Sequence, residues 1–446
     1  MKNTFNDFFN KLLNTYTLLR FNYSSNCLKK QLGYLYLNQH EKYDFNLVKQ
    51  DYLAKILSYV IKEVPFYKGI DKPHLNNFTI VNKSIYQARR ESDFQSQLFH
   101  FIAKYKMNTG GSTGEPFYFY AGLKAGLIDS LHQEYQHKKM GLTTDSKLYT
   151  FNGCMPERQL IEKNIFWQYK RHKSQLPFGS KEFSTHFLHE KNIEYYLKEL
   201  LISPPDFIRS YPSAMCDLTQ LLIKAGFNEK PFSLKGIQLT SEVMSTQQED
   251  TIKAYWGDII YHQYGHSEVA TIASKYPGDD CYCFSPLYGE VEILDEDGKH
   301  VEPHCEGRIV VTSYHNYARP FIRYDTGDLA IYKDSNNGIV KAYNITGRAQ
   351  DYVVNISNQN ISVTGLVFGQ HFKAFANILQ WQIINSKPGD LLVRIVKSKD
   401  FVQEDENEVL DKLGFNGQFS VTIEYVKMIQ KTVRGKHKLV IREFDS

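Results

Sequence analysis

At 446 residues the chain is too long for one ordinary hydrophobic core, so we expect two or more packed units. Hydrophobic residues make up 42% of the chain and charged residues 23%, values close to the averages for a soluble globular protein. The 53 basic and 49 acidic residues leave a formal net charge of +4, and no basic tail stands out. Charge therefore gives little support to nucleic-acid binding, whereas small phosphate-bearing substrates are compatible with it.

The first hundred residues predict mainly helices. Apolar residues recur at amphipathic spacing within residues 1–20, which indicates a helix packed on the body of the protein or attached to a membrane surface rather than a secretory signal. A second helical pattern at 46–64 ends at Pro65. No stretch approaches the roughly 18 apolar residues needed to span a bilayer. The six cysteines are scattered, so we expect thiols and a reducing, cytoplasmic setting.

The central part of the chain alternates between short apolar runs and helical patterns. A Gly/Ser/Thr loop at 106–114 leads into a strand-like run at 116–120 and a helix at 123–139. Beyond it, buried strands are expected at 148–151, 207–210 and 237–240. Strands interleaved with helices predict an α/β core of parallel sheets flanked by helices.

The last third of the chain changes character. Strands and a hairpin turn of a β-rich subdomain are expected at 289–294, 307–313 and 295–298. Later strands, with helices between them, are expected at 391–396 and 421–426. We therefore predict a large N-terminal domain over residues 1–346 and a small α+β C-terminal domain over residues 347–446.

A glycine-rich loop, Thr-Gly-Gly-Ser-Thr-Gly at residues 109–114, is the first candidate for phosphate binding. Its glycines, Gly114 among them, lack a Cβ, which lets backbone N–H groups turn toward an anion. The hydroxyls of Thr109, Ser112 and Thr113 add further donors. No Gly-Lys-Ser/Thr follows, so the loop is not a Walker A motif. By itself such a run could also be a surface turn.

Further segments carry residues suited to a nucleotide. Within Tyr-Gly-His-Ser-Glu at 264–268, the Tyr264 ring could stack on a base and Glu268 could bind a hard cation. Asp328 follows an extended run and could accept both hydroxyls of a ribose, while Arg348 supplies a guanidinium about twenty residues later. Lys436 ends Lys-Thr-Val-Arg-Gly-Lys at 431–436. The alternatives are a structural ion pair between Asp328 and Arg348, and a merely solvated basic tail around Lys436.

In this order, these segments resemble the adenylate-forming acyl-CoA synthetase superfamily. Within it they look like the branch of phenylacetate–CoA ligases, coenzyme F390 synthetases and capsular-polysaccharide CapK-like proteins. Tyr-Pro-Ser-Ala at 211–214 and Val-Pro-Phe-Tyr at 64–67 are similar to that branch in particular, and the resemblance covers about residues 64–436. It implies ATP-dependent activation of a carboxylic acid as an acyl-adenylate, followed by transfer of the acyl group to a nucleophile.

The resemblance also implies roles for single residues. The nucleotide-binding set comprises Thr109, Ser112, Thr113, Gly114, Ser241, Glu242, Tyr264, Gly265, His266, Ser267, Asp328 and Arg348. Ser112 and Thr113 would hold the β- and γ-phosphates, and Ser241 and Glu242 match the adenine-side loop. Tyr264 would stack on adenine, Asp328 would accept the ribose hydroxyls, and Arg348 would bind the ribose or the α-phosphate. Glu268 would hold Mg²⁺.

Lys436 would be the catalytic lysine. A lysine there can bridge the substrate carboxylate and the α-phosphate and so stabilise the negative charge that grows in the transition state. In the family it arrives only when a mobile C-terminal domain swings closed over the large ATP- and acid-binding domain. His266 is the second catalytic candidate, as part of the acid pocket, with a core histidine as the alternative.

The chain also departs from the family pattern. Gln350 stands where the family often has Asp or Lys as the hinge, and Asn355, Asn358 and Asn360 stand where a glycine turn is common. This neighbourhood helps to bind CoA in the CoA-using enzymes, so the acceptor stays open: a CoA thiol, or an amine or hydroxyl in surface-polysaccharide modification. Two other functions stay open, namely adenylyl transfer to a cofactor as in F390 synthetases and a non-catalytic nucleotide-binding module.

The remaining predictions concern metals, the acid and assembly. Cys281, Cys283, His304 and Cys305 could supply a zinc site, but their spacing is irregular and buried free cysteines are commoner. We expect ATP and Mg²⁺ as cofactors, CoA as a candidate, and no zinc. The 31 Tyr and 29 Phe favour an aryl or apolar acid only weakly, because rings also fill cores. A homodimer would be unsurprising for this branch.

Overall fold

The computed structural model describes most of the chain, namely residues 26–37, 43–100, 102, 104–108, 118–169, 179–242, 244, 246–348, 352–363, 366, 373–415, 417–432 and 438–444. Several sequence predictions lie outside the described residues. These are the helix at 1–20, the hinge residue Gln350, the catalytic candidate Lys436 and the glycine-rich loop with Thr109, Ser112, Thr113 and Gly114.

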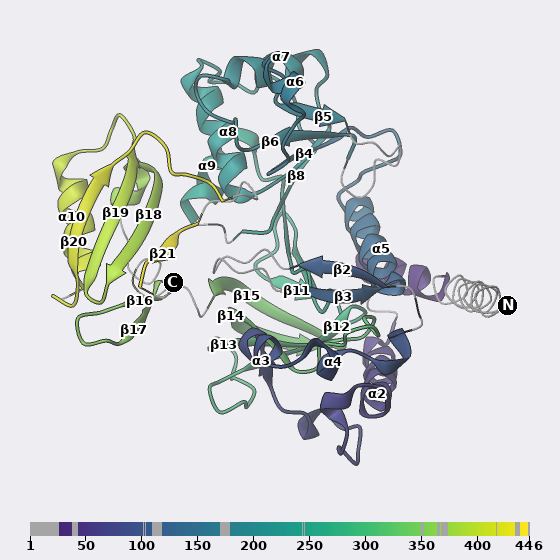
Figure 1. Ribbon diagram of the computed structural model, residues 1–446. Coiled ribbons are helices and arrows are strands. Elements are labelled where there is room, and N and C mark those ends of the chain that lie inside the picture. Colours follow the sequence, from purple (N-terminus) through teal and green to yellow (C-terminus); the bar gives the residue numbers. More distant parts are fainter. Residues whose placement is uncertain are drawn as a thin grey trace.

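Five parallel strands form one half of a 13-stranded sheet (Figure 1). In spatial order they are β6 (Lys181–Ser184), β4 (Leu148–Asn152), β7 (Phe207–Ser210), β8 (Gly236–Thr240) and β9 (Ile260–Gly265). The first four residues of β4 and of β8 are fully buried, as expected for parallel strands covered on both faces. The strands predicted from the apolar runs in this part of the chain are thus confirmed.

Helices connect these parallel strands. They are α7 (Ile193–Ile202), α8 (Pro212–Lys224) and α9 (Thr246–Trp256), and they share one hydrophobic core with the strands. Pro212 at the first position of α8 has the backbone angle that a helix start requires. Helix α5 (Leu123–Lys139) has the bounds predicted for it, and the short elements α6 (Arg158–Ile161) and β5 (Trp167–Tyr169) complete this half.

The other half of the sheet is antiparallel, in the order β9, β10, β11, β15, β14, β13, β12. The bounds are β10 (Ile272–Lys275), β11 (Tyr282–Phe284), β12 (Gly289–Leu294), β13 (Glu306–Ser313), β14 (Tyr324–Asn336) and β15 (Ile339–Arg348), and the two-residue β1 (Val81–Asn82) pairs with β14. Asn337 and Gly338 connect β14 to β15, both with positive φ, as a tight Asn-Gly hairpin turn requires. The predicted β-rich region and its strands are confirmed.

N-terminal helices and a hairpin pack beside the antiparallel half (Figure 1). The helices are α2 (Phe45–Glu63), η2 (Pro65–Tyr67), η3 (Leu75–Asn77), α3 (Lys83–Ala88), α4 (Glu91–Phe94) and η4 (Gln97–His100); the hairpin pairs β2 (Lys104–Asn108) with β3 (Tyr118–Gly122). The Asp44 side chain caps α2, which ends before Pro65 as predicted. Within the described part of the chain, no helix has the length and apolar character to cross a membrane.

The C-terminal residues build a separate four-stranded sheet with its own core, drawn in yellow-green in Figure 1. Its order is β20 (Ser420–Tyr425), β19 (Asp390–Lys397), β18 (Ile378–Lys387) and β21 (Val440–Arg442). The other elements here are β16 (Tyr352–Val354), β17 (Asn360–Ser362), η6 (Ala374–Asn377) and α10 (Gln403–Gly414). The predicted fold class is confirmed, whereas the domain boundary at residues 346–347 stays a prediction.

The turn at Gly338 should be sensitive to a single methyl group. Gly338 and Gly278 both have positive φ, so an alanine at either position should cost about 1–2 kcal/mol of backbone strain. At Gly338 a Cβ would also meet backbone atoms of Phe45 and Asn46 at 3.3 Å, whereas at Gly278 it meets nothing within 4 Å. Gly338→Ala should therefore lower the free energy of unfolding in urea more than Gly278→Ala does. Equal losses would contradict the proposed packing of this turn on α2.

Candidate functional site

The sheet curls between its two halves. Strands β9 and β14 are four steps apart in strand order, which in a flat sheet would separate them by about 19 Å. Nevertheless, the Tyr264 hydroxyl on β9 donates a hydrogen bond of 2.7 Å to Oδ2 of Asp328 on β14. The β11–β15 pairing is limited to two residue pairs, which leaves room for a sharp change of direction there. The curl brings together two side chains that the sequence predicted for one nucleotide site.

Tyr264 is held firmly. Its burial, reinforced by the Asp328 carboxylate, raises the pKa of the hydroxyl well above its ordinary value, so the group keeps its proton and remains a donor. The ring meets Phe284 edge-on, with centroids 6.0 Å apart, and His266 edge-on at 6.2 Å. The ring and the carboxylate predicted for base and ribose are thus fixed relative to each other.

Glu268 and His266 form a second pair in the turn after β9. The His266 Nδ1 lies 3.3 Å from Oε2 of Glu268, and the Tyr324 hydroxyl donates to Oε1 at 3.3 Å. Burial alone would raise the pKa of Glu268, but the charge and hydrogen bond of His266, with help from Tyr324, hold this pKa below its ordinary value. Glu268 is therefore a buried carboxylate kept ionised, as a Mg²⁺ ligand would have to be.

The ring nitrogens of His266 are compatible with both interpretations of this residue. Nδ1 faces Glu268, and Nε2 is buried and has no hydrogen-bond partner within the described residues. The buried residues His132, His137 and His315 each have a ring nitrogen of the same kind, so this feature does not separate a ligand-pocket histidine from a core histidine. The role of His266 in the acid pocket stays a prediction.

The part of β14 that carries Asp328 is held by hydrogen bonds within the strand and to β13. Asp325 accepts from the Gly327 N–H at 2.9 Å and from Arg308 at 2.8 Å. The Thr326 hydroxyl accepts from the Asp328 N–H at 3.1 Å and donates to a carbonyl of β13 at 2.9 Å. These contacts fix the Asp328 backbone from within the protein.

The sequence predictions missed the supporting roles of Tyr324 and Thr326. A signal was available, because alternate residues of a strand share one face. Tyr324, Thr326 and Asp328 are alternate residues at the start of β14. Arg308, by contrast, comes from β13 and gave no signal in the sequence.

The segment after β8 has two distinct features. Ser241 is exposed and has a φ of 71°, a conformation that non-glycine residues rarely adopt and that often marks functional loops. The Glu242 carboxylate accepts from the Ser213 N–H at 3.2 Å, at the start of α8. A negative charge there satisfies a free N–H group and complements the helix dipole. Glu242 thus supports α8, whatever else it contacts.

Of the remaining predicted residues, Gly265 ends β9 and Ser267 follows in the turn beside His266. Arg348 ends β15 directly opposite Asp328 in the strand register, while the position of its side chain lies outside the described part of the structure. The described site therefore unites Tyr264, His266, Glu268 and Asp328, with the loop after β8 at the end of a neighbouring strand.

The cysteines do not gather with other ligands. In the described ranges, no group of three or more His, Cys, Asp or Glu side chains is placed to hold a metal ion. Cys281 Sγ lies 3.7 Å from Lys333 Nζ, and burial raises the pKa of the neighbouring Cys283 thiol to about 12.

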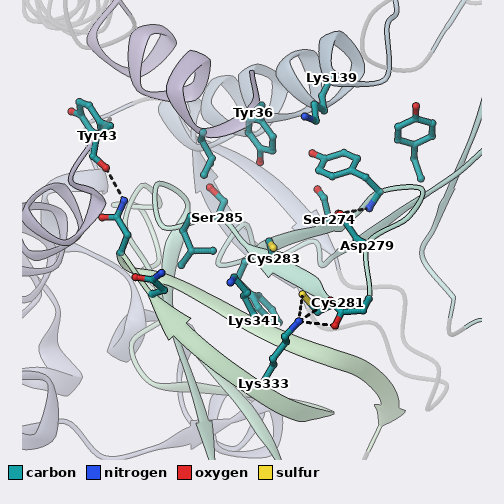
Figure 2. A pocket seen from close by; sticks show the side chains of 18 of the residues that line it. Tyr36, Tyr43, Lys139, Ser274, Asp279, Cys281, Cys283, Ser285, Lys333 and Lys341 are labelled. Carbon is teal, nitrogen blue, oxygen red and sulfur yellow. Dashed lines mark hydrogen bonds and ion pairs between the residues drawn. The ribbon is translucent and has the colours of Figure 1, made fainter. Parts of the chain in front are cut away.

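A cavity of about 1250 Å³ is lined by Cys281, Cys283 and Lys333 among other residues (Figure 2). Figure 2 shows Tyr36 and Lys139 facing Cys281 and Lys333 across it. It contains none of the residues predicted for the nucleotide. Its lysines are engaged, for example Lys333 with Asp280 at 2.7 Å, so the cavity is a poor candidate for the phosphate site.

Comparison with known proteins bears on the family resemblance and on the fold. A family model described as the CapK C-terminal domain matches residues 353–443. Protein CapK of Staphylococcus aureus is 22% identical over 426 residues, which cover 89% of both chains.

Solved structures give the fold. A 2-hydroxyisobutyryl-CoA ligase in its postadenylation state, in complex with R3-HIB-AMP, matches with a TM-score of 0.63 at 16% identity over 89% of both chains. The same ligase with 2-HIB-AMP and CoA, in its thioesterification state, matches with a TM-score of 0.52 at 18% identity and the same coverage. The predicted resemblance is therefore confirmed: the C-terminal part of the chain matches the CapK C-terminal domain, most of the chain is similar to protein CapK, and the fold is that of the adenylate-forming ligases.

Proposed function

We propose that the protein uses ATP to activate a carboxylic acid as an acyl-adenylate and then transfers the acyl group to a nucleophile. The observation that carries this proposal is the convergence of Tyr264, Glu268 and Asp328 in a chain with the fold of the adenylate-forming ligases. A ring, an ionised carboxylate and a second carboxylate meet the needs of a base, a hard cation and a ribose.

The chain's residues would divide the work as follows. Tyr264 would stack on adenine while its hydroxyl orients Asp328 toward the ribose hydroxyls. Glu268 would hold Mg²⁺, which when bound neutralises phosphate charge. His266 would present its unpaired Nε2 to the acid. Ser241 and the loop residues Thr109, Ser112, Thr113 and Gly114 would line the adenine and the phosphates, with Arg348 at the ribose or α-phosphate.

Lys436 would complete the site from the C-terminal domain, residues 347–446. Its ammonium would stabilise negative charge between the substrate carboxylate and the α-phosphate. The acid has to be shielded from water while the acyl phosphate forms, and the product then has to meet its acceptor. A domain that closes and reopens satisfies both needs.

The acceptor would be a CoA thiol, or an amine or hydroxyl of a surface-polysaccharide precursor. The fold similarity to a ligase solved with 2-HIB-AMP and CoA supports a thiol acceptor. The similarity to protein CapK over 89% of both chains supports an amine or hydroxyl acceptor, as expected for CapK-like proteins. Mass spectrometry of the acylated product would identify the acceptor. Release of an adenylylated cofactor in place of AMP would favour adenylyl transfer.

The Lys436→Ala variant tests the adenylation step. Loss of one charge-stabilising donor should lower acid-dependent exchange of pyrophosphate into ATP by about 10²- to 10³-fold, with ATP affinity nearly unchanged. The matched control is Lys438→Ala, which removes a lysine from the same basic segment. Equal effects of the two variants would favour a solvated basic tail. No exchange by the wild-type protein across a broad acid panel, with ATP binding intact, would refute the proposed reaction.

The Tyr264→Phe variant tests the nucleotide site. It keeps the ring but removes the 2.7 Å hydrogen bond to Asp328, which should raise the KM for ATP about two- to tenfold, the equivalent of roughly 0.5–1.5 kcal/mol. Tyr282→Phe is the control, because it removes another largely buried hydroxyl, one that contacts His262 at 3.3 Å. A KM for ATP that changes equally in both variants would argue against the assignment.

A further inference from the structure

A single carboxylate on helix α8 receives two side chains from the C-terminal part of the chain. Oδ2 of Asp217 lies 2.9 Å from Lys431 Nζ, and Oδ1 accepts from Gln380 Nε2 at 2.8 Å. The Asp217 and Lys431 side chains are 11% and 9% exposed, so this ion pair is largely removed from water. A buried ion pair of this kind favours one geometry, because a buried charge that loses its partner is energetically costly.

The contact extends on both sides of the ion pair. Lys431 also donates to the Thr185 carbonyl at 3.2 Å, and Gln380 accepts from the Ile429 N–H at 3.2 Å. Thus Asp217 and Thr185, from the parallel half, meet Gln380, Ile429 and Lys431, from the C-terminal sheet and the segment after β20. Figure 1 shows the C-terminal sheet beside the region of α8.

The position of this contact relates it to the proposed site. Thr185 directly follows β6, and α8 begins two residues after β7, so both contacts belong to the carboxyl end of the parallel strands. Ser241 and His266 follow β8 and β9 at that same end. In an open parallel sheet this end is where ligands bind.

We propose that Asp217 is a positioning residue that docks Lys431 and thereby sets the orientation of the C-terminal sheet against the parallel half of the large sheet that acyl-adenylation requires. The inference rests on the proposed function for its effect on adenylation, but the docking contact itself does not depend on it. Asp217 touches neither nucleotide nor acid and acts through the placement of the C-terminal part.

Asp217→Asn is the central test, because it preserves the shape of the side chain and its bond with Gln380 but removes the charge. Acid-dependent pyrophosphate exchange should fall about 10- to 100-fold through kcat, as expected for a misplaced catalytic group, with the KM for ATP within twofold of wild type. Lys431→Met should have a similar effect. The double variant should be no worse than either single variant, since both remove one interaction.

A distance measurement reports docking independently of activity. Spin labels at the exposed positions 163 and 399, in a background with the exposed Cys27 and Cys305 replaced by serine, should show a longer or broader distance distribution in Asp217→Asn. The control is Lys224→Gln, because Lys224 also lies on α8 and its exposed ion pair with Glu190 is broken by this substitution. This control should change neither the exchange rate nor the distances.

The outcomes separate the two proposals. Exchange by Asp217→Asn within twofold of wild type, or additive losses in the double variant, would overturn the positioning role. An unchanged distance distribution would overturn docking by this pair. If no acid supports pyrophosphate exchange by the wild-type protein, the proposed function and the role of Lys436 fail. The distance measurements still decide whether Asp217 docks the C-terminal part.

Discussion

The curl of the large sheet is the constraint on which the candidate site depends. Parallel strands place loops at their carboxyl ends, and antiparallel strands supply a rigid extended arm, but a flat sheet would keep the two apart. The short β11–β15 pairing permits the sheet to turn, and the hydrogen bond of 2.7 Å between Tyr264 and Asp328 closes it. Any change that flattened the sheet would separate this pair without altering either residue.

The surroundings of this hydrogen bond are organised by contacts within the protein. Asp325 and Thr326 fix the backbone before Asp328, while His266 and Tyr324 hold the charge of Glu268. Strain accumulates in the same place, since Ser241 and Val269 both have positive φ. Conformations of this kind persist where the surrounding structure enforces them, and they cluster at functional loops.

The sequence was informative where local patterns decide the structure. The apolar runs located β4, β7 and β8, the helix at 123–139 has the bounds of α5, and the order of the motifs assigned Tyr264 and Asp328 to one nucleotide site. Alternation along a strand and the chemistry of a side chain are properties that neighbouring residues carry. They do not require knowledge of the rest of the fold.

Contacts between distant segments could not be predicted in this way. The sequence assigned Glu242 to the adenine-side loop, yet its carboxylate also caps α8, a contact that depends on how β8 and α8 meet. Asp217 and Lys431 are 214 residues apart in the sequence, and no sequence pattern predicted a contact between them. The roles of the glycine-rich loop, Arg348 and Lys436 stay predictions, because the described structure does not include the groups that would test them.

The chemistry of the Asp217–Lys431 contact would suit an interface that forms and releases, as the proposed function requires. Apolar surfaces gain free energy in proportion to the area they bury and tolerate small displacements, so they would hold the C-terminal part in a range of orientations. A buried ion pair contributes little net stability, because desolvation opposes its attraction, but it requires one geometry. Water can solvate both charges again when the pair separates, so the docked orientation can be specific without being permanent.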